Sequence, residues 1–198
     1  MRTEQLTLDF ERPLAETLDE GSCPHMAILL ESVDDVPSAL ASFYALGVRR
    51  NGWLFHRALP GRGEDDRAGL QAAGLDVPTL EAEQRFELCE LPLTDPPESW
   101  AQPYVPLVEN RLARGFDAVW WSRFPIGQDE DLYRLALLYD RYWEACWHGR
   151  QAVSMCVYIV GGLPSDVREA RIRDLRAIHD QTLLLPPDRN LLALPRSE

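Results

Sequence analysis

The sequence lacks the segments that would place the protein in or across a membrane. It has no apolar run of about 18 residues, the length that a membrane-spanning helix requires. Residues 1–20 are polar and acidic, without the basic region and apolar run of a signal peptide. We therefore expect a cytoplasmic protein that makes no membrane contact.

Motifs built from cysteine and histidine are also missing. The cysteines have neither the CxxC pairs of a zinc motif nor the density of a disulfide framework, so reduced, buried thiols are expected; they are Cys23, Cys89, Cys146 and Cys156. The histidines are scattered too, and no GxSxG, HExxH or glycine-rich dinucleotide motif occurs. We therefore expect no metal, no cofactor and no enzymatic activity, with most histidines in structural roles.

The chain is poor in positive charge. Lysine and arginine number 20 against 32 aspartate and glutamate, which gives a formal net charge of −12 at pH 7. Such a charge repels the phosphate backbones of DNA and RNA, and no basic run offsets it locally. Direct binding to nucleic acid is therefore not expected.

What the sequence does contain is the composition of one folded domain. Its 198 residues are 45% apolar and 26% charged, which suits a single well-buried core. Residues 1–22 are weakly patterned and predict a mobile or loosely docked N-terminal arm. Residues 23–198 are expected to form a single α/β domain.

Apolar runs alternate with helical patterns from residue 24 onward. This alternation predicts βαβ units and hence a three-layer sandwich, in which helices flank a mainly parallel sheet. Strands are expected at Met26–Leu30, Trp53–Leu59, Phe86–Leu91, Phe116–Phe124 and Ala152–Val160, with edge strands at Thr182–Leu185 and Leu191–Leu194. Helices are expected near 36–47, 65–73, 105–112, 132–146 and 165–180, the last capped by Ser165. The helix near 132–146 has the clearest apolar face, made of Leu132, Leu135, Ala136, Tyr139, Tyr142, Trp143 and Cys146.

The turn after the first strand lacks a phosphate-binding loop. Residues 31–37 contain no glycine or lysine and carry three carboxylates, Glu31, Asp34 and Asp35, that would repel a triphosphate. Ser122 follows the apolar run 118–121, where a nucleotide-hydrolysing site would hold magnesium with an acid. Both features favour a binding or regulatory module over a nucleotide hydrolase.

Polar residues near the strand ends are the ligand-binding candidates, because ligands of parallel α/β sheets bind beyond the carboxyl ends of the strands. Glu31 with Arg57 or Arg123 can close over a polar ligand, although charges at strand ends often only pair with each other. Trp121 and Tyr158 can wall an apolar pocket, although such aromatic residues are more often plain core. An enzyme built around Glu31 and Arg123 is a third interpretation.

Short motifs along most of the chain resemble the MEDS domain, a sensory domain of bacterial and archaeal regulators. They are Pro24-His-Met-Ala-Ile-Leu-Leu30, Ala41-Ser-Phe-Tyr-Ala-Leu-Gly47, Arg114-Gly-Phe-Asp-Ala-Val-Trp-Trp121, Met155-Cys-Val-Tyr158 and Ile178-His179. The resemblance implies a RecA/KaiC-like fold without the phosphate-binding loop and a ligand of the class of small hydrocarbon derivatives. The family-like positions are His25, Trp121, Cys156, Tyr158 and His179.

These interpretations predict a non-enzymatic sensory or regulatory domain that binds a small, partly apolar ligand or a protein partner. The expected ligand-binding residues are His25, Glu31, Arg57, Trp121, Ser122, Arg123, Tyr158 and His179. No DNA-binding or kinase domain accompanies these motifs, so the output is expected to pass through a protein partner. Homo-oligomers are also expected, because RecA-like folds commonly associate.

A second resemblance lies at the N-terminus, where Gln5-Leu-Thr-Leu-Asp-Phe10 is similar to the QxxLxF peptide that docks bacterial proteins on the replication sliding clamp. In such a peptide Leu8 and Phe10 fill an apolar pocket while Gln5 supplies a hydrogen bond. The alternative function is therefore a DNA replication or repair accessory protein. The other interpretation of the same residues is an edge strand of the domain itself, in which Leu6, Leu8 and Phe10 alternate onto one side.

Overall fold

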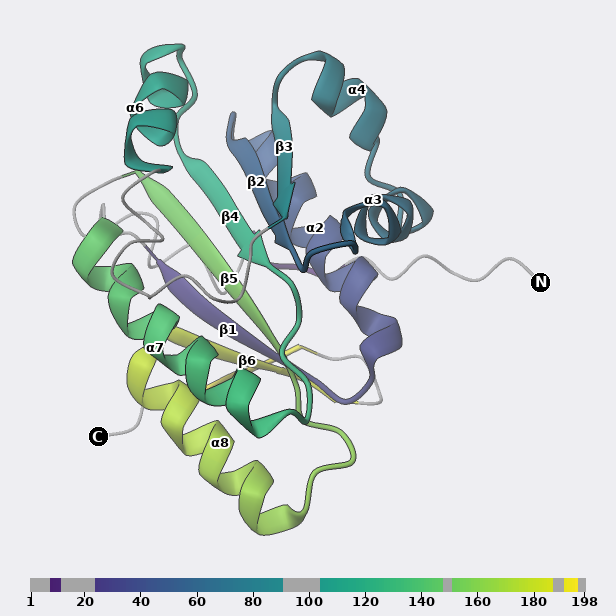
Figure 1. Ribbon diagram of the computed structural model, residues 1–198, viewed down its shortest axis with the longest axis vertical. Helices are drawn as coiled ribbons and strands as arrows, with labels where there is room; N and C mark the ends of the chain where they lie inside the picture. Colours follow the sequence, from purple (N-terminus) through teal and green to yellow (C-terminus); the bar gives the residue numbers. More distant parts are fainter. Residues whose placement is uncertain (1–7, 12–23, 91–103, 148–150, 187–190, 196–198) are drawn as a thin grey trace.

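A seven-stranded sheet forms the centre of the computed structural model, which describes residues 8–11, 24–90, 104–147, 151–186 and 191–195. The strand order is β3-β2-β4-β5-β1-β6-β7 (Figure 1). All neighbouring strands are parallel except β6 and β7, which are antiparallel. The strands are β1 (His25–Leu30), β2 (Trp53–Ala58), β3 (Phe86–Glu90), β4 (Val119–Arg123), β5 (Ala152–Ile159), β6 (Gln181–Leu185) and β7 (Leu192–Leu194).

Helices cover both faces of the sheet (Figure 1). One face carries α2 (Val36–Arg49), α3 (Gly63–Ala72) and α4 (Val77–Ala82), with the 3-10 turn η1 (Val33–Asp35) leading into α2. The other face carries α6 (Val105–Ala113), α7 (Glu130–Trp147) and α8 (Ser165–Ile178). The predicted α/β class with a mainly parallel sheet is confirmed. None of the helices in these ranges is long and apolar enough to cross a membrane.

The strands divide the core into two layers, because successive side chains of a strand point to opposite faces. In β1, Met26, Ile28 and Leu30 belong to the core beneath α2, whereas Ala27 and Leu29 belong to the core beneath α7 and α8. Every residue of β1 is buried, as expected for a strand covered on both sides. The face on which a strand residue lies therefore decides which helices it meets.

Three details of the secondary structure differ from the prediction. The helix α4 was not expected, because six residues are too few to show a helical period; Asp76 caps it by accepting a hydrogen bond from the Thr79 amide. The segment 182–185 is not an edge, since β6 lies between β1 and β7. Ser165 lies inside α8 and Pro164 holds the N-cap position without a capping side chain.

The buried side of α7 is also rotated from the predicted apolar face. It consists of Tyr133, Ala136, Asp140, Trp143 and Trp147. Several residues of the predicted face are only half-buried: Leu132, Leu135, Tyr139, Tyr142 and Cys146. The true stripe keeps the helical spacing of three or four residues, and it carries one carboxylate into the core.

Residues 8–11 of the predicted arm are packed on the domain. Leu8 and Phe10 are 6% and 1% exposed and belong to the core beneath α2. The Leu8 amide donates to Ser42 Oγ at 3.0 Å, and the Phe10 ring meets Phe43 edge-on at 6.3 Å. These residues form no strand, and Gln5 and Leu6 lie outside the described residues. Docking on a sliding clamp would first have to withdraw Leu8 and Phe10 from this core.

We predict that Phe10→Ala lowers the free energy of unfolding by about 3–5 kcal/mol, because it empties a fully buried aromatic position. The matched control is Glu11→Ala, which changes an exposed side chain and should stay within about 0.5 kcal/mol of wild type. Urea denaturation measures both. If Phe10→Ala unfolds at the same urea concentration as wild type, the arm is loosely docked and its QxxLxF peptide is available to a partner.

Candidate functional site

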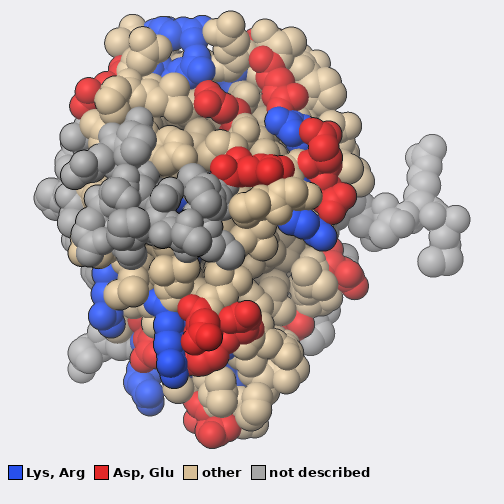
Figure 2. Space-filling view, viewed as in Figure 1, with Lys and Arg blue, Asp and Glu red and all other residues tan. Residues whose placement is uncertain are grey.

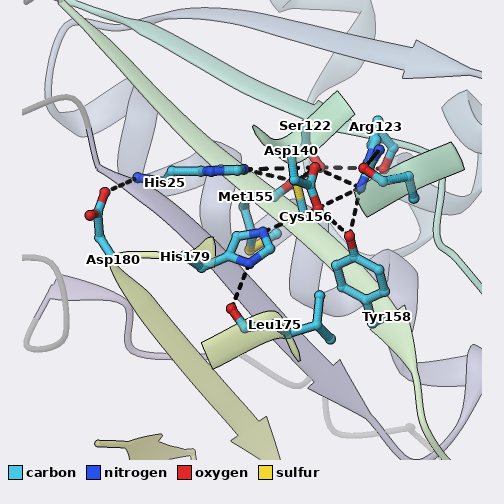
Figure 3. Close-up of polar contacts among 11 residues, drawn as sticks. His25, Ser122, Arg123, Asp140, Met155, Cys156, Tyr158, Leu175, His179 and Asp180 are labelled. Atoms are coloured by element: carbon cyan, nitrogen blue, oxygen red, sulfur yellow. Dashed lines mark hydrogen bonds and ion pairs between the residues drawn. The ribbon is translucent and has the colours of Figure 1, made fainter. Parts of the chain in front are cut away.

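A buried ion pair lies between the sheet and α7. Asp140, on α7, is 3% exposed, and its Oδ1 and Oδ2 lie 2.8 and 3.0 Å from Arg123 Nη2 at the end of β4. Tyr158 on β5 accepts a hydrogen bond from Arg123 Nη2 at 2.8 Å and donates one to Asp140 Oδ2 (Figure 3). Arg123 Nη1 also donates to the Ala136 carbonyl at 3.4 Å. The carboxylate, the guanidinium and the phenol thus form one closed network.

Two imidazoles and a thiol surround the same carboxylate. His25 Nε2 lies 3.8 Å from Asp140 Oδ1, and His179 Nε2 lies 3.3 Å from Oδ2. The Cys156 thiol donates to Oδ1 at 3.3 Å and lies 3.5 Å from His25 Nε2. The rings of His25 and His179 stack at a tilt with their centroids 4.2 Å apart. Figure 3 shows the side chains of His25, His179 and Cys156 converging on Asp140.

Strand register explains why distant residues meet here. His25 pairs with Ser154, and Ala27 pairs with Cys156, so the start of β1 lies beside the middle of β5. His179 follows α8 directly. Two hydrogen bonds of the next residue, Asp180, hold His179 next to His25. The His25 amide donates to Asp180 Oδ2 at 2.9 Å, and the Asp180 amide donates to the His25 carbonyl at 2.8 Å.

Burial and charge set the protonation states of the cluster. Burial alone would raise the pKa of the Asp140 carboxyl, but Arg123, His179 and His25 together outweigh burial and hold that pKa well below its usual range. Burial would lower the pKa of the Arg123 guanidinium, yet Asp140, Cys156 and Tyr158 together raise it above the ordinary value. Burial lowers the pKa of His25, and burial raises the pKa of the Cys156 thiol. At neutral pH the cluster therefore holds one ion pair, a neutral His25 and a protonated Cys156.

A small cavity opens beside the cluster. The space available to the centre of a water molecule is about 20 Å³, enough for a molecule of a few heavy atoms. Its lining residues are His25, Arg57, Trp121, Arg123, Tyr139, Asp140, Trp143, Ser154 and Cys156. The Arg57 guanidinium lies over the rings of Tyr104, Trp121 and Tyr139 at 5.7, 5.7 and 5.9 Å, and burial lowers its pKa to about 10. The cavity thus combines aromatic walls with a cation.

A second pocket lies at the carboxyl ends of the strands, where the ligand was expected. It has about 180 Å³ of space for the centre of a water molecule. Its lining is mainly apolar and comes from η1 and the start of α2, from α3 and its N-cap, and from Pro125 beyond β4: Val33, Val36, Pro37, Leu40, Arg62, Asp65, Asp66, Gly69, Leu70 and Pro125. None of the residues predicted to bind ligand lines it.

The predicted site residues fall into two groups. His25, Arg57, Trp121, Arg123, Tyr158 and His179 share the face beneath α7 and α8. Ser122 points to the opposite face and donates to the Met155 carbonyl at 2.8 Å. Glu31 forms an ion pair with Arg168 of α8, so the expected pairing of Glu31 with Arg57 or Arg123 is not formed.

Sequence reasoning missed Asp140, the centre of the cluster. The available signal was a single carboxylate on the stripe of α7 that runs through Tyr133, Ala136, Trp143 and Trp147. A charge at helical spacing among aromatic residues marks a buried polar site, because an unpaired charge would be expelled from such a face. The predicted face of α7 excluded Asp140 because it was centred on the neighbouring residues.

The sheet order and the two helix layers define a RecA/KaiC-like fold. Among the solved structures similar to this one is a KaiC-like protein from the hyperthermophilic archaeon Pyrococcus horikoshii, with a TM-score of 0.57 and 13% sequence identity. The match covers 100% of this chain and 89% of that one, and at this identity it shows the fold alone. No protein-family model and no curated protein matches the sequence.

We predict that Asp140→Asn lowers the free energy of unfolding by about 3–5 kcal/mol, because it leaves the Arg123 cation buried without its counter-charge. The compensating control is the double variant Arg123→Met/Asp140→Leu, which removes both charges and should recover most of the loss. Urea denaturation of the two variants and wild type measures the effect. If Asp140→Asn is as stable as wild type, the Arg123 cation is stabilised by water and not by the Asp140 carboxylate.

Proposed function

We propose that the chain is a non-enzymatic sensory or regulatory domain that binds a small, partly apolar molecule in the cavity beside Asp140. The observation that carries this proposal is the placement of a buried ion pair, two imidazoles and a thiol against one small cavity. A buried ion pair is rarely more stable than the apolar residues that could replace it. Clusters of this kind therefore concentrate at functional sites.

The lining of the cavity sets the class of ligand. Trp121 and Trp143 offer apolar ring faces, while Arg57 presents a cation at the same space. A molecule with a short hydrocarbon part and a carboxylate matches both features, because a guanidinium can bind a carboxylate with two hydrogen bonds. With about 20 Å³ available, the ligand is of the size of formate, acetate or propionate.

The MEDS-like positions support a sensory role. His25, Trp121, Cys156, Tyr158 and His179 are distant in sequence, yet all of them either line the cavity or belong to the Asp140 cluster. Motifs that carry the resemblance thus coincide with the candidate site. This coincidence favours a ligand of the class of small hydrocarbon derivatives over a nucleotide.

The connection between β1 and α2 supports a function other than nucleotide hydrolysis. Ser32 Oγ accepts a hydrogen bond from the Asp34 amide at 3.1 Å and so caps the short turn η1. The side chains of Asp34 and Asp35 in that turn are acidic, and Glu31 before it is paired with Arg168. Acidic side chains also gather over α3 and near the start of α7 on the face drawn in Figure 2. Such surroundings disfavour a polyphosphate.

Output to a protein partner would run through α7. This helix holds Asp140 and Trp143 against the cavity, and it exposes Leu138, 47% accessible, on its outer side. A ligand that moves the Trp143 ring would shift the same helix that a partner can contact. Bound ligand and bound partner would then be coupled through one rigid element.

We predict that formate, acetate or propionate raises the unfolding temperature, because a ligand that binds only the folded state stabilises it. At ten times its dissociation constant a ligand contributes about 1.4 kcal/mol, or roughly 3–5 °C for a chain of this size. Thermal-shift assays with acetate and with its neutral analogue acetamide measure the effect, and acetamide should give a smaller shift.

The same assay on two arginine variants tests the site. Arg57→Met should abolish the shift, whereas Arg62→Met, which changes a largely exposed side chain at the start of α3, should keep it. An equal shift in Arg57→Met and wild type would place the ligand elsewhere. Strong stabilisation by ATP with magnesium would overturn the proposal in favour of a nucleotide site.

A further inference from the structure

Four metal-ligating side chains meet at the Asp140 cluster. The donor atoms of His25, Asp140, Cys156 and His179 all lie within 4.8 Å of one another, and all four residues are buried. They come from β1, α7, β5 and the end of α8. A buried set of two imidazoles, a thiol and a carboxylate is the ligand type that zinc prefers.

The spacing of these donor atoms fits a four-coordinate ion. Zinc binds nitrogen and oxygen at about 2.0–2.2 Å and sulfur at about 2.3 Å, so the ligands of a tetrahedral site lie roughly 3.3–3.7 Å apart. Around Asp140 Oδ1, the distances to Cys156 Sγ and His25 Nε2 are 3.3 and 3.8 Å. The distance from Cys156 Sγ to His25 Nε2 is 3.5 Å, and that from His179 Nε2 to Oδ2 is 3.3 Å. Binding requires shifts of only a few tenths of an ångström at these pairs.

The orientation of His179 provides an independent observation. Its Nδ1 lies 3.0 Å from the Leu175 carbonyl, and a carbonyl only accepts, so Nδ1 carries a proton and donates. Nε2, the other ring nitrogen, is fully buried and faces Asp140 Oδ2 at 3.3 Å. Both atoms can coordinate one cation, and the Leu175 bond holds the imidazole in the tautomer that a metal needs.

We propose that His25 Nε2, Asp140, Cys156 Sγ and His179 Nε2 bind one thiophilic divalent metal ion of the zinc type. The Cys156 proton leaves to solvent on binding, so the ion is held by a thiolate and by the carboxylate that also pairs with Arg123. Asp140 keeps its bonds to Arg123 and Tyr158. Its Oδ1 faces Cys156 and His25, and its Oδ2 faces His179, so the carboxylate borders the ion through both oxygens. The cavity provides the entry path, since it is lined by His25, Asp140 and Cys156.

This site goes beyond the proposed ligand function and does not depend on it. The metal is held by the side chains of the cluster, whereas the small molecule is held by Arg57 and the tryptophans of the adjoining cavity. A metal titration without any organic ligand tests the metal site, and the thermal-shift assay on metal-free protein tests the small-molecule site. Either can fail while the other succeeds.

The test is a titration of the chelator-treated full chain with Co²⁺ and then Zn²⁺. We expect one Co²⁺ per chain with a sulfur-to-cobalt charge-transfer absorption, displaced by one equivalent of Zn²⁺. Cys156→Ser should abolish the absorption and weaken Co²⁺ binding at least about 100-fold. His179→Gln should weaken binding to a similar degree while retaining the thiolate absorption at saturating Co²⁺.

Two cysteine variants serve as matched controls. Cys89→Ser changes a half-buried thiol on β3, away from the cluster, and Cys23→Ser changes a thiol outside the described residues but close to His25 in sequence. Both should bind Co²⁺ like wild type. Circular dichroism of each variant in chelator verifies that it is folded. The proposal is overturned if folded wild type shows no thiolate absorption, or if Cys23→Ser loses the absorption while Cys156→Ser retains it.

Discussion

The ion pair between Arg123 and Asp140 is the constraint on which the rest of this face depends. Both groups are removed from water, and a charge in that position is tolerated only with a partner and further hydrogen bonds. Tyr158 and the Ala136 carbonyl accept further hydrogen bonds from the guanidinium. The chain contains arginine but no lysine, and the planar, permanently charged guanidinium suits such a buried pair better than an ammonium would.

The other residues of the cluster are arranged around the two oxygens of the Asp140 carboxylate. Its two oxygens are approached by side chains from β1, β4, β5 and the end of α8, while α7 supplies the carboxylate itself. An aspartate can accept several bonds in its plane, which is why one short side chain can be shared by a cation, a phenol, a thiol and two imidazoles. A shift in the register of these strands would separate the groups, because each group is held in place by the strand or helix on which it lies.

The sequence was sufficient for the fold because its strands are continuous apolar runs and its longer helices have clear periods. The β1 run and the α7 pattern exemplify both signals, and the six-residue α4 shows where the helical signal fails. The candidate site was predictable in part: residues such as Arg123 and His179 were chosen, but the face of the sheet that they share was not predicted. Which strand residues share a face depends on register, and register across a parallel sheet is set by tertiary packing that no local pattern records.

Asp140 also could not be predicted from a local sequence pattern. Its meaning depends on Arg123 opposite it, 17 positions earlier in the chain, and a single helix pattern contains no information about that partner. Glu31 was equally ambiguous, because the choice between Arg57, Arg123 and Arg168 as its partner is a matter of where α8 lies over the sheet. The sequence shows which charged groups need partners in the core, but the identity of each partner depends on how the helices pack on the sheet.

The bond that ties His25 to Asp180 spans 155 residues, and this has a consequence for how the protein folds. A contact of such sequence separation forms only when the loop-closure entropy of the intervening chain has been overcome. The Asp140 carboxylate is therefore enclosed by both histidines only in a chain whose C-terminal segment is docked beside β1. An occupant of this cluster would consequently select the completely folded chain, and its binding energy would oppose global unfolding instead of ordering one loop.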